Sequence, residues 1–477
     1  PASGTGRLMC GIAGLISSNK NINAGAVVSG MLETIGHRGP DQQDYATYDD
    51  TTLGMVRLSI VDPKPHPIPI VDPDERYAIV YNGEIYNHDS IRASLASRYS
   101  FQTDSDIETA LAAYITQGVD SFQNHNGMYA FAIYDRELRE TVLVRDKAGE
   151  KPLYYTQGKD YIAFASEMKA LLEIVEPRFN YEAISYDAYE FTVGKETLFK
   201  DVYALEPGEY LHIKDGRMSV HNYWKVWDNL IEVSDDKNRV LDDLSELVED
   251  AILLRKKNTS YEYATFLSGG IDSSLVTCIA KPERIYTAHY DYADFDELDY
   301  AKMVAKKVGR DLEIVKPKRE DFIRTQDSVA FAMDTPCTWT SFTLWMLMEK
   351  VAADGNKVVL TGDGADELFA GYHRYHLLHH DEQIHNLEAM QQYSYLIGKY
   401  YGSPVERYAK LVNRSEDQYD KQVWDYLHQT IGSYYDVMGE DVVHFMGLND
   451  FYSTMQVLLQ MADRAHMAFS IENRSPF

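Results

Sequence analysis

The chain lacks the features that define disulfide-stabilised and membrane-spanning proteins. Its 477 residues include three cysteines, Cys10, Cys278 and Cys337. An odd and sparse set of this kind argues against a disulfide framework and indicates a reducing compartment. No uninterrupted apolar run reaches the ~18 residues that a membrane-spanning helix needs, and we see no secretory signal. We therefore expect a cytoplasmic protein without a membrane partner.

Basic residues are scarce as well. The chain has 46 Lys and Arg against 74 Asp and Glu, which gives a formal net charge of −28 at pH 7. Such a charge repels phosphate backbones, so we expect no nucleic-acid partner. Anionic substrates then need local basic or metal sites. The length leaves room for two or three domains, each with its own core.

The chain also lacks internal repeats and low-complexity tracts, but its two halves differ in pattern. Residues 10–215 contain short β-type runs broken by turn residues, with helical patterns at 27–35 and 107–117. The runs 128–134 and 140–144 predict a hairpin. Taken alone, Asn82-Gly83 also favours a hairpin turn. This half is expected to be an α+β layered domain.

Strands and helices alternate in the second half. Strand patterns at 264–267, 284–288, 312–315 and 358–361 are separated by helical patterns, which indicates a parallel sheet with crossover helices. From about residue 371 the sequence is mostly helical. We interpret His373, His376, His379 and His380, at helical spacing, as a solvated or interface face rather than a metal site.

Cys10 is followed by Gly11 and Gly14, so a cysteine here has small neighbours and room around it. Alone this is a weak signal, because buried cysteines usually serve packing. Further motifs follow it in order: His37-Arg38-Gly39-Pro40-Asp41, Arg57-Leu58-Ser59, Tyr81-Asn82-Gly83-Glu84-Ile85-Tyr86-Asn87, Thr103-Asp104-Ser105-Asp106, Arg145-Asp146 and Phe164-Ala165-Ser166-Glu167.

A glycine loop opens the second half. Ser268-Gly269-Gly270-Ile271-Asp272-Ser273-Ser274 follows a predicted strand and begins a helix, where backbone N–H groups and the helix dipole favour phosphate. The Walker pattern is absent. A second loop, Thr361-Gly362-Asp363-Gly364-Ala365-Asp366, also follows a predicted strand.

Together these motifs resemble the glutamine-hydrolysing asparagine synthetase family. The resemblance implies an α+β four-layer N-terminal-nucleophile hydrolase domain at 10–215, with antiparallel sheets between helices. It further implies a linker at 216–238 and an α/β parallel-sheet ATP-pyrophosphatase domain with a helical C-terminal part at 239–477. Residues 1–9 are expected to be a leader. While they remain attached, Cys10 has no free α-amine and glutaminase activity is expected to be absent or very weak.

The resemblance assigns roles in glutamine hydrolysis. The Cys10 thiolate attacks the glutamine amide carbon, with the α-amine of Cys10 as base. The Asn82 side chain and the Gly83 backbone N–H hold the oxyanion. Arg57 pairs with the α-carboxylate of glutamine. The α-ammonium is held by Glu84 and Asp106.

The resemblance also assigns an ATP site. Asp272 and Asp366 hold Mg²⁺ on the pyrophosphate, and Asp363 lies near the acyl-adenylate. Arg464 is expected near phosphate, with an exposed helical ion pair as the alternative. The nucleotide contacts are expected from Leu267, Ser268, Gly269, Gly270, Asp272, Ser273, Ser274, Ala288, Thr361 and Gly362.

The acceptor is an open question at this stage. Members that use aspartate have a Thr-Thr-x-Arg-Ala pattern in the acceptor segment, where this chain has Cys337-Thr338-Trp339-Thr340. We place Trp339, with Asp363, in the acceptor pocket. An aromatic ring in place of a cation favours a sugar acid or a bulkier carboxylate.

The expected function is a glutamine- and ATP-dependent amidotransferase acting on a small carboxylate, with a homodimer as the expected assembly. The alternatives are a true asparagine synthetase, a cyclising amide synthetase and a non-catalytic scaffold. An RNA-modifying pyrophosphate-loop enzyme is opposed by the net charge of −28.

Overall fold

The computed structural model describes residues 10–57, 67–181, 194–231, 234–257, 261–290, 297–372 and 442–477, with a few single residues and pairs between these ranges. The histidines at 373–380 lie outside the described residues. Within the described part of the chain, no helix is both long and apolar enough to cross a membrane.

The N-terminal domain is built on two six-stranded antiparallel sheets. The first has the order β10-β8-β9-β1-β3-β2 and the second β12-β11-β7-β6-β5-β4. The strands are β1 (Gly11–Ile16), β2 (Gln42–Tyr48), β3 (Thr51–Arg57), β4 (Ile70–Val71), β5 (Tyr77–Ile85), β6 (Gly127–Asp135), β7 (Glu140–Arg145), β8 (Tyr154–Gln157), β9 (Ile162–Ala165), β10 (Tyr203–Ala204), β11 (Glu209–Lys214) and β12 (Arg217–Asn222).

Helices cover the outer faces of the two sheets. α1 (Ala24–Thr34) and α4 (Met168–Leu171) contact the first sheet, and α3 (Asp106–Gln117), with α2 (His88–Leu95) beside it, contacts the second. One core cluster joins the inner faces and includes Ile12 and Leu53 from one sheet and Val80 and Phe131 from the other. This confirms the expected four-layer architecture.

Local predictions in this domain had mixed outcomes. β6 and β7 form the predicted hairpin, with Asp135 opposite Glu140. Asn82-Gly83 is not a turn, because β5 continues through it with Asn82 opposite Ala130 and Gly83 opposite Tyr129. The second sheet continues through β12, inside the stretch expected to be a linker, because β12 pairs along its whole length with β11.

The C-terminal domain has a five-stranded parallel sheet with the order β15-β14-β13-β16-β17. Its strands are β13 (Tyr263–Phe266), β14 (Arg284–Ala288), β15 (Leu312–Val315), β16 (Val358–Leu360) and β17 (Glu472–Arg474). The helices are α6 (Lys237–Arg255), α7 (Ile271–Ala280), α8 (Leu298–Val308), α9 (Arg319–Met333), α10 (Trp339–Ala353), α11 (Ala365–Phe369), α16 (Val442–Tyr452) and α17 (Thr454–Ala468). The predicted alternation is confirmed, whereas β17 was not predicted.

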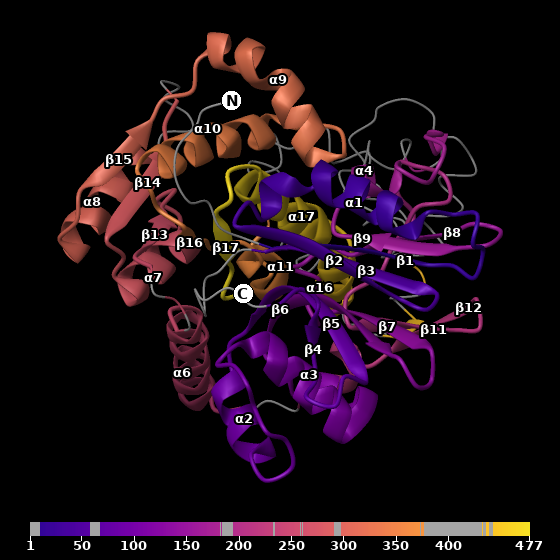
Figure 1. Ribbon diagram of the computed structural model, residues 1–477. Helices are drawn as coiled ribbons and strands as arrows, with labels where there is room; N and C mark the ends of the chain where they lie inside the picture. The colour runs from indigo at the N-terminus through magenta and orange to yellow at the C-terminus, as the bar shows by residue number, and fades with distance from the viewer. Residues whose placement is uncertain are drawn as a thin grey trace.

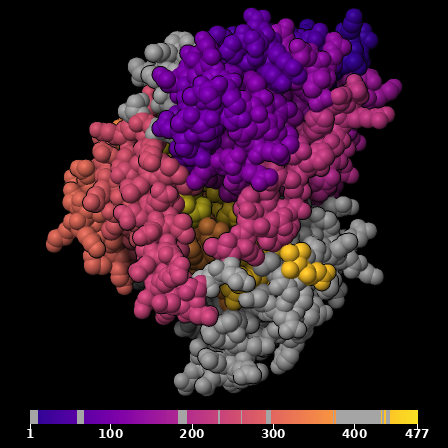
Figure 2. Space-filling model, turned by 90° about the horizontal axis from the view of Figure 1, so that it is seen from below, coloured from indigo at the N-terminus to yellow at the C-terminus, as the bar shows by residue number. Residues whose placement is uncertain are grey.

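α17 lies between the two domains (Figure 1). It contacts α9 and α10 on one side and the short 3-10 helix Gly36–Arg38 of the N-terminal domain on the other. Figure 2 shows a hollow on one face of the molecule, between N-terminal residues in purple and C-terminal residues in pink, with yellow C-terminal atoms deep inside it. The interdomain region is therefore both packed and accessible.

Candidate functional site

Cys10 lies immediately before β1, a central strand of the first sheet. Its carbonyl oxygen accepts a hydrogen bond of 3.2 Å from Arg38 Nε. A β-carbon at Gly11 would lie 3.0 Å from Ile35 Cδ1 and 3.1 Å from Arg38 Cδ. The glycine after the cysteine therefore lets the Gly36–Arg38 helix pack closely against the strand that carries the candidate nucleophile.

Asn82 and Gly83 lie in β5, which contacts β1 across the two sheets. Asn82 is 1% exposed, and among the described residues its Nδ2 has no hydrogen-bond partner. Gly83 has φ +144°, and an added β-carbon would lie 2.0 Å from Met128 O, so only glycine fits. A buried amide donor without a partner is costly unless it meets a ligand, and an oxyanion hole has this property.

The other candidate glutamine ligands are also buried. Asp106 Oδ2 accepts a 3.0 Å hydrogen bond from Ile85 N, and burial raises the pKa of this carboxyl. Glu84 Oε2 lies 3.9 Å from Arg474 Nη2 of the C-terminal domain. Arg57, at the end of β3, is 5% exposed. Their contacts with glutamine stay predictions.

The glycine loop has the geometry of an anion cradle. Leu267, which is buried, follows β13, and α7 begins at Ile271. Gly270 N donates to Ser268 Oγ at 3.1 Å, and the hydroxyls of Ser268 and Ser273 lie 3.0 Å apart. These bonds shape the loop at the N-terminus of a ten-residue helix, where phosphate is favoured.

The second loop touches the first. A β-carbon at Gly362 would lie 3.0 Å from Ser273 N and 3.3 Å from Asp272 Cβ. Burial raises the pKa of Asp272, and the negative charge of Asp366 raises it further. The two carboxylates predicted to hold a metal therefore act on one another, although they come from loops about ninety positions apart in the sequence.

This carboxylate pair fits Mg²⁺, which prefers hard oxygen ligands and is commonly held by one or two carboxylates plus phosphate oxygens. Among the described residues, no group of three or more His, Cys, Asp or Glu forms a metal site. A cation between Asp272 and Asp366 would therefore complete its coordination with phosphate and water. It would also relieve the repulsion between the two charges.

β17 and the residue after it contact Thr361, the first residue of the second loop. Thr361 Oγ1 donates to Asp363 Oδ2 at 2.8 Å and also lies 3.1 Å from both Asn473 Oδ1 and Ser475 Oγ. Thr361 N donates to Arg474 O at 3.3 Å. Burial raises the pKa of Asp363, while the Thr361 and Asn473 hydrogen bonds oppose that shift. The stretch 472–477 resembles the family in sequence, but sequence reasoning gave these residues no role in supporting the second loop.

The exposed ion pair that was one of the two expectations for Arg464 is wrong. Its side chain is excluded from solvent, so it is not part of an exposed ion pair. Arg464 Nη1 lies 3.1 Å from Glu167 Oε2 in the N-terminal domain and 3.4 Å from Asp334 Oδ2 in the C-terminal domain. The guanidinium therefore pairs with carboxylates of both domains.

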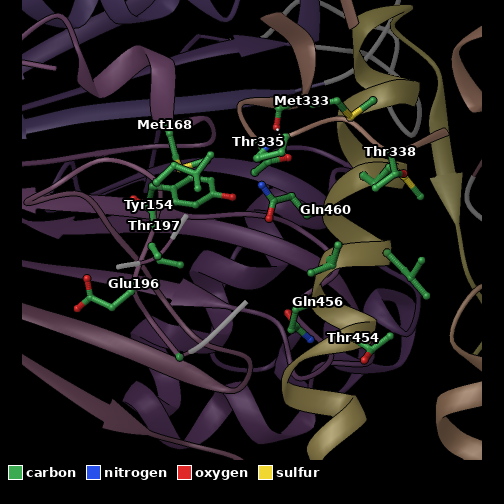
Figure 3. Close-up of a pocket in the computed structure, with 18 of the residues that line it drawn as sticks. Tyr154, Met168, Glu196, Thr197, Met333, Thr335, Thr338, Thr454, Gln456 and Gln460 are labelled. Atoms are coloured by element: carbon green, nitrogen blue, oxygen red, sulfur yellow. Dashed lines mark hydrogen bonds between the residues drawn. The ribbon is translucent and has the colours of Figure 1, made fainter. Parts of the chain in front are cut away.

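Trp339 is the first residue of α10 and is 59% exposed. Its ring centroid lies 5.7 Å from that of Tyr290, which follows β14. Trp339 lines a cavity of about 460 Å³ to which both domains contribute, shown in Figure 3. Asp363 is not among the residues that line this cavity. Ala288, the last residue of β14, is partly buried at the same end of the sheet.

Comparison with known proteins finds two family models that match consecutive parts of the chain. Residues 9–224 match the family model of a glutamine amidotransferase domain, and residues 243–477 match that of asparagine synthase. Asparagine synthetase [glutamine-hydrolyzing] 1 of Bacillus subtilis is 31% identical over 380 residues, which is 77% of this chain and 59% of that protein.

Other relatives carry two kinds of name. Asparagine synthetase B of Escherichia coli is 29% identical over 386 residues, covering 75% of this chain and 64% of its own. Amidase chry2 of Gibberella zeae is 29% identical over 419 residues, covering 80% and 62%. The chain thus spans about six-tenths of the length of these relatives. Because the two family models cover nearly all of it in the order of the motifs, the chain belongs to the asparagine synthetase family, with a glutamine amidotransferase domain followed by an asparagine synthase domain.

Proposed function

We propose that the chain is a glutamine-dependent, ATP-dependent amidotransferase that forms an amide on an acceptor carboxylate. The observation that carries this proposal is the contact between the two loops of the C-terminal domain, at Gly362 and Asp272-Ser273. It joins a phosphate cradle at a helix N-terminus to a pair of acidic metal ligands. The second domain then has a use for the ammonia that the first would release.

In the N-terminal domain, the Cys10 thiolate attacks the side-chain amide carbon of glutamine. The tetrahedral oxyanion takes hydrogen bonds from Asn82 Nδ2 and Gly83 N, and its collapse expels ammonia and leaves a thioester. Water hydrolyses the thioester to glutamate. This chemistry needs a free α-amine on Cys10 as base, which a form beginning at Cys10 has.

In the C-terminal domain, a carboxylate oxygen of the acceptor attacks the α-phosphorus of ATP, and the bond to pyrophosphate breaks. The residues 268–274 hold the pyrophosphate. Asp272 and Asp366 would hold Mg²⁺, which would neutralise charge on the leaving group. Ammonia then attacks the acyl carbon, and AMP leaves with the bonding electron pair. Asp363, whose pKa is raised by burial, takes the proton lost by the nitrogen.

An isotope experiment tests the whole scheme. A form beginning at Cys10 is incubated with ATP, Mg²⁺, a panel of carboxylic acids that includes aspartate, and glutamine carrying ¹⁵N in its amide. The proposal predicts ¹⁵N in a new amide, with one AMP formed for each amide. Glutamate release without any AMP would reject the synthetase half, and AMP without glutamate release would reject the glutaminase half.

Aspartate is the acceptor that the printed names of two relatives suggest. A non-catalytic scaffold is opposed by the presence of Cys10, Asp272 and Asp366 together. The homodimer and the cytoplasmic location expected from the sequence stay predictions.

A further inference from the structure

The cavity beside Trp339 is too large for a small amino acid. Its volume is about 460 Å³, which falls within the ~300–1,000 Å³ of sites for drug-sized ligands. Figure 3 shows Tyr154 and Met168 of the N-terminal domain on one side and Gln456 and Gln460 of α17 on the other. Cavities between domains are a common location for ligand sites.

Its lining favours an apolar ring. Three methionines, Met168, Met333 and Met461, line the cavity together with Tyr154 and Trp339. Thioethers adapt to the shape of a partner and contact aromatic rings favourably, and exposed aromatic faces stack on planar groups. Trp339 touches Tyr290 yet is 59% exposed, so much of its ring is available to a ligand.

The described lining of the cavity does not favour a negative charge on the ligand in addition to the carboxylate that reacts. Arg145 is the one cation among the described residues that line it. Its guanidinium already donates to the carbonyl oxygens of Lys151, Leu205 and Gly149. A carboxylate brought here would lose water without gaining a cationic partner, which is strongly unfavourable.

Gln460 provides a donor for the ligand. Its Nε2 is buried, and among the described residues it has no hydrogen-bond partner. In Figure 3 the Gln460 amide points across the cavity toward Tyr154. Gln456, one turn earlier, differs, because its Nε2 donates to Ala148 O and Phe451 O and its Oε1 accepts from Arg145. A carbonyl oxygen on the ligand would satisfy Gln460.

Trp339 links this cavity to the edge of the sheet that carries the nucleotide loop, because its ring lies against Tyr290, which follows β14, the strand paired with β13. Met461, which lines the cavity, packs against the same core cluster as Phe266, and that cluster contains Met333. Phe266 is the last residue of β13 and precedes Ser268 by two positions. A ligand in the cavity can therefore have its body between the domains and one end directed to the adenylation loop.

We propose that the acceptor is a carboxylic acid with a bulky, uncharged, ring-containing body that carries a carbonyl oxygen, and that the cavity lined by Trp339 and Gln460 holds this body. This inference rests on the proposed function and names its substrate class. Aspartate fits poorly, because it leaves most of the cavity empty, and Arg145, the one cation among the described lining residues, is already bonded to backbone carbonyls.

A matched pair of acids tests the proposal in the unchanged protein, with ammonium as the nitrogen donor. The acids para-acetylbenzoate and para-isopropylbenzoate have the same shape, but only the first carries a carbonyl oxygen. We expect AMP formation with both, a lower KM for the acetyl compound, and little AMP with aspartate. Gln460→Leu should raise the KM for the acetyl compound ~10-fold with little change in kcat, and so remove its advantage.

Two further variants make the result decisive. Gln326→Leu, the same change on the exposed face of α9, should leave both KM values unchanged. Trp339→Arg should raise the use of aspartate and lower the use of both ring acids together. Efficient AMP formation with aspartate but not with the ring acids would overturn this inference and leave the proposed function standing. AMP formation with none of the three acids would also overturn this inference, whereas the proposed function fails only if no acid of the isotope experiment's panel yields AMP.

Discussion

Arg464 Nη1 of α17 lies 3.1 Å from Glu167 Oε2 of the N-terminal domain, and neither side chain is exposed to solvent. Arg38 extends this contact, because its Nη1 lies 2.8 Å from Glu167 Oε1 and 2.9 Å from Asp463 Oδ2. Burial alone would raise the pKa of Glu167, but the charges of His37, Lys169 and Arg464 outweigh it and hold that pKa well below the ordinary range. The two domains are therefore joined through a buried network of charges.

Arg464→Met should destabilise the protein strongly. The change leaves Glu167 and Asp334 without one of their cationic partners in a buried position, and breaking a buried pair from one side costs ~3–5 kcal/mol. Urea unfolding followed by tryptophan fluorescence measures the loss. The control is Arg239→Met, since Arg239 pairs with Asp243 on the exposed face of α6 and such pairs contribute ~0–1 kcal/mol. Equal losses in the two variants would contradict the buried network.

Cys10→Ala and Asn82→Ala should separate the two activities in a form beginning at Cys10. The first removes the nucleophile, and the second removes a buried amide donor aimed at the oxyanion, which costs ~10²–10³-fold in kcat. Ammonia-dependent AMP formation should continue in both. Glutamate release and AMP release are measured side by side. Full glutaminase activity in Asn82→Ala would show that Asn82 does not contribute to the oxyanion hole.

Residues 1–9 provide a separate test. The protein that retains residues 1–9 should use ammonia but not glutamine, because Cys10 then has no free α-amine. Removal of these residues should restore glutamine hydrolysis. The measurement is glutamate production before and after removal. Full activity with the residues attached would show that another group serves as the base.

Asp272→Asn and Asp366→Asn should each lower AMP formation ~10²-fold or more, because each removes a negative oxygen ligand where charge develops on the pyrophosphate. Glutamine hydrolysis should be unaffected. Asp299→Asn on α8, whose carboxylate is exposed and pairs with Lys302, is the matched control. Near-normal AMP release from either loop variant would show that the replaced carboxylate does not hold the metal.

Acid should destabilise the protein through His466. This side chain is fully buried, its Nδ1 lies 2.7 Å from Ala462 O, and burial lowers its pKa to about 4. The unfolded chain, with a pKa near 6.5, binds more protons between pH 4 and 6.5. The free energy of unfolding therefore falls as the pH drops through this window, by up to ~1.4 kcal/mol per pH unit.

Unfolding of His466→Leu across the same pH range tests this statement. Leucine cannot gain a proton, so the variant should show a shallower pH dependence between pH 4 and 6.5. His221→Leu on β12, an exposed position, should keep the slope of the unchanged protein. Identical slopes in all three proteins would show that His466 does not contribute.

The elements that follow local rules were predictable from the sequence. The alternation of strands and helices indicated the parallel sheet, and the loops after β13 and β16 lie at its carboxyl edge, where ligands bind in open α/β sheets. Asn82-Gly83 shows the limit of such rules. The dipeptide favours a turn, yet β5 runs through it because Gly83 fits against Met128 with a φ that other residues avoid.

Features that depend on contacts between distant parts of the chain were not predictable. Asp463-Arg464 has the pattern of a solvated helix face. The pair is buried because Arg38 and Glu167 of the N-terminal domain pack against it and form ion pairs with it. β17 consists of the polar residues Glu472, Asn473 and Arg474, which have no strand pattern of their own. It forms because β16 offers a parallel edge and Arg474 is buried against backbone carbonyls.

The most direct test of the proposed function is the identity of the products that ATP yields. The unchanged protein and Asp272→Asn are incubated with ATP, Mg²⁺, ammonium and the acceptor acids, and the nucleotides are separated by chromatography. We expect AMP and pyrophosphate in equal amounts, formed only when a carboxylic acid is present and lost in Asp272→Asn. ADP and phosphate as products, or AMP formation that needs no carboxylate, would contradict it.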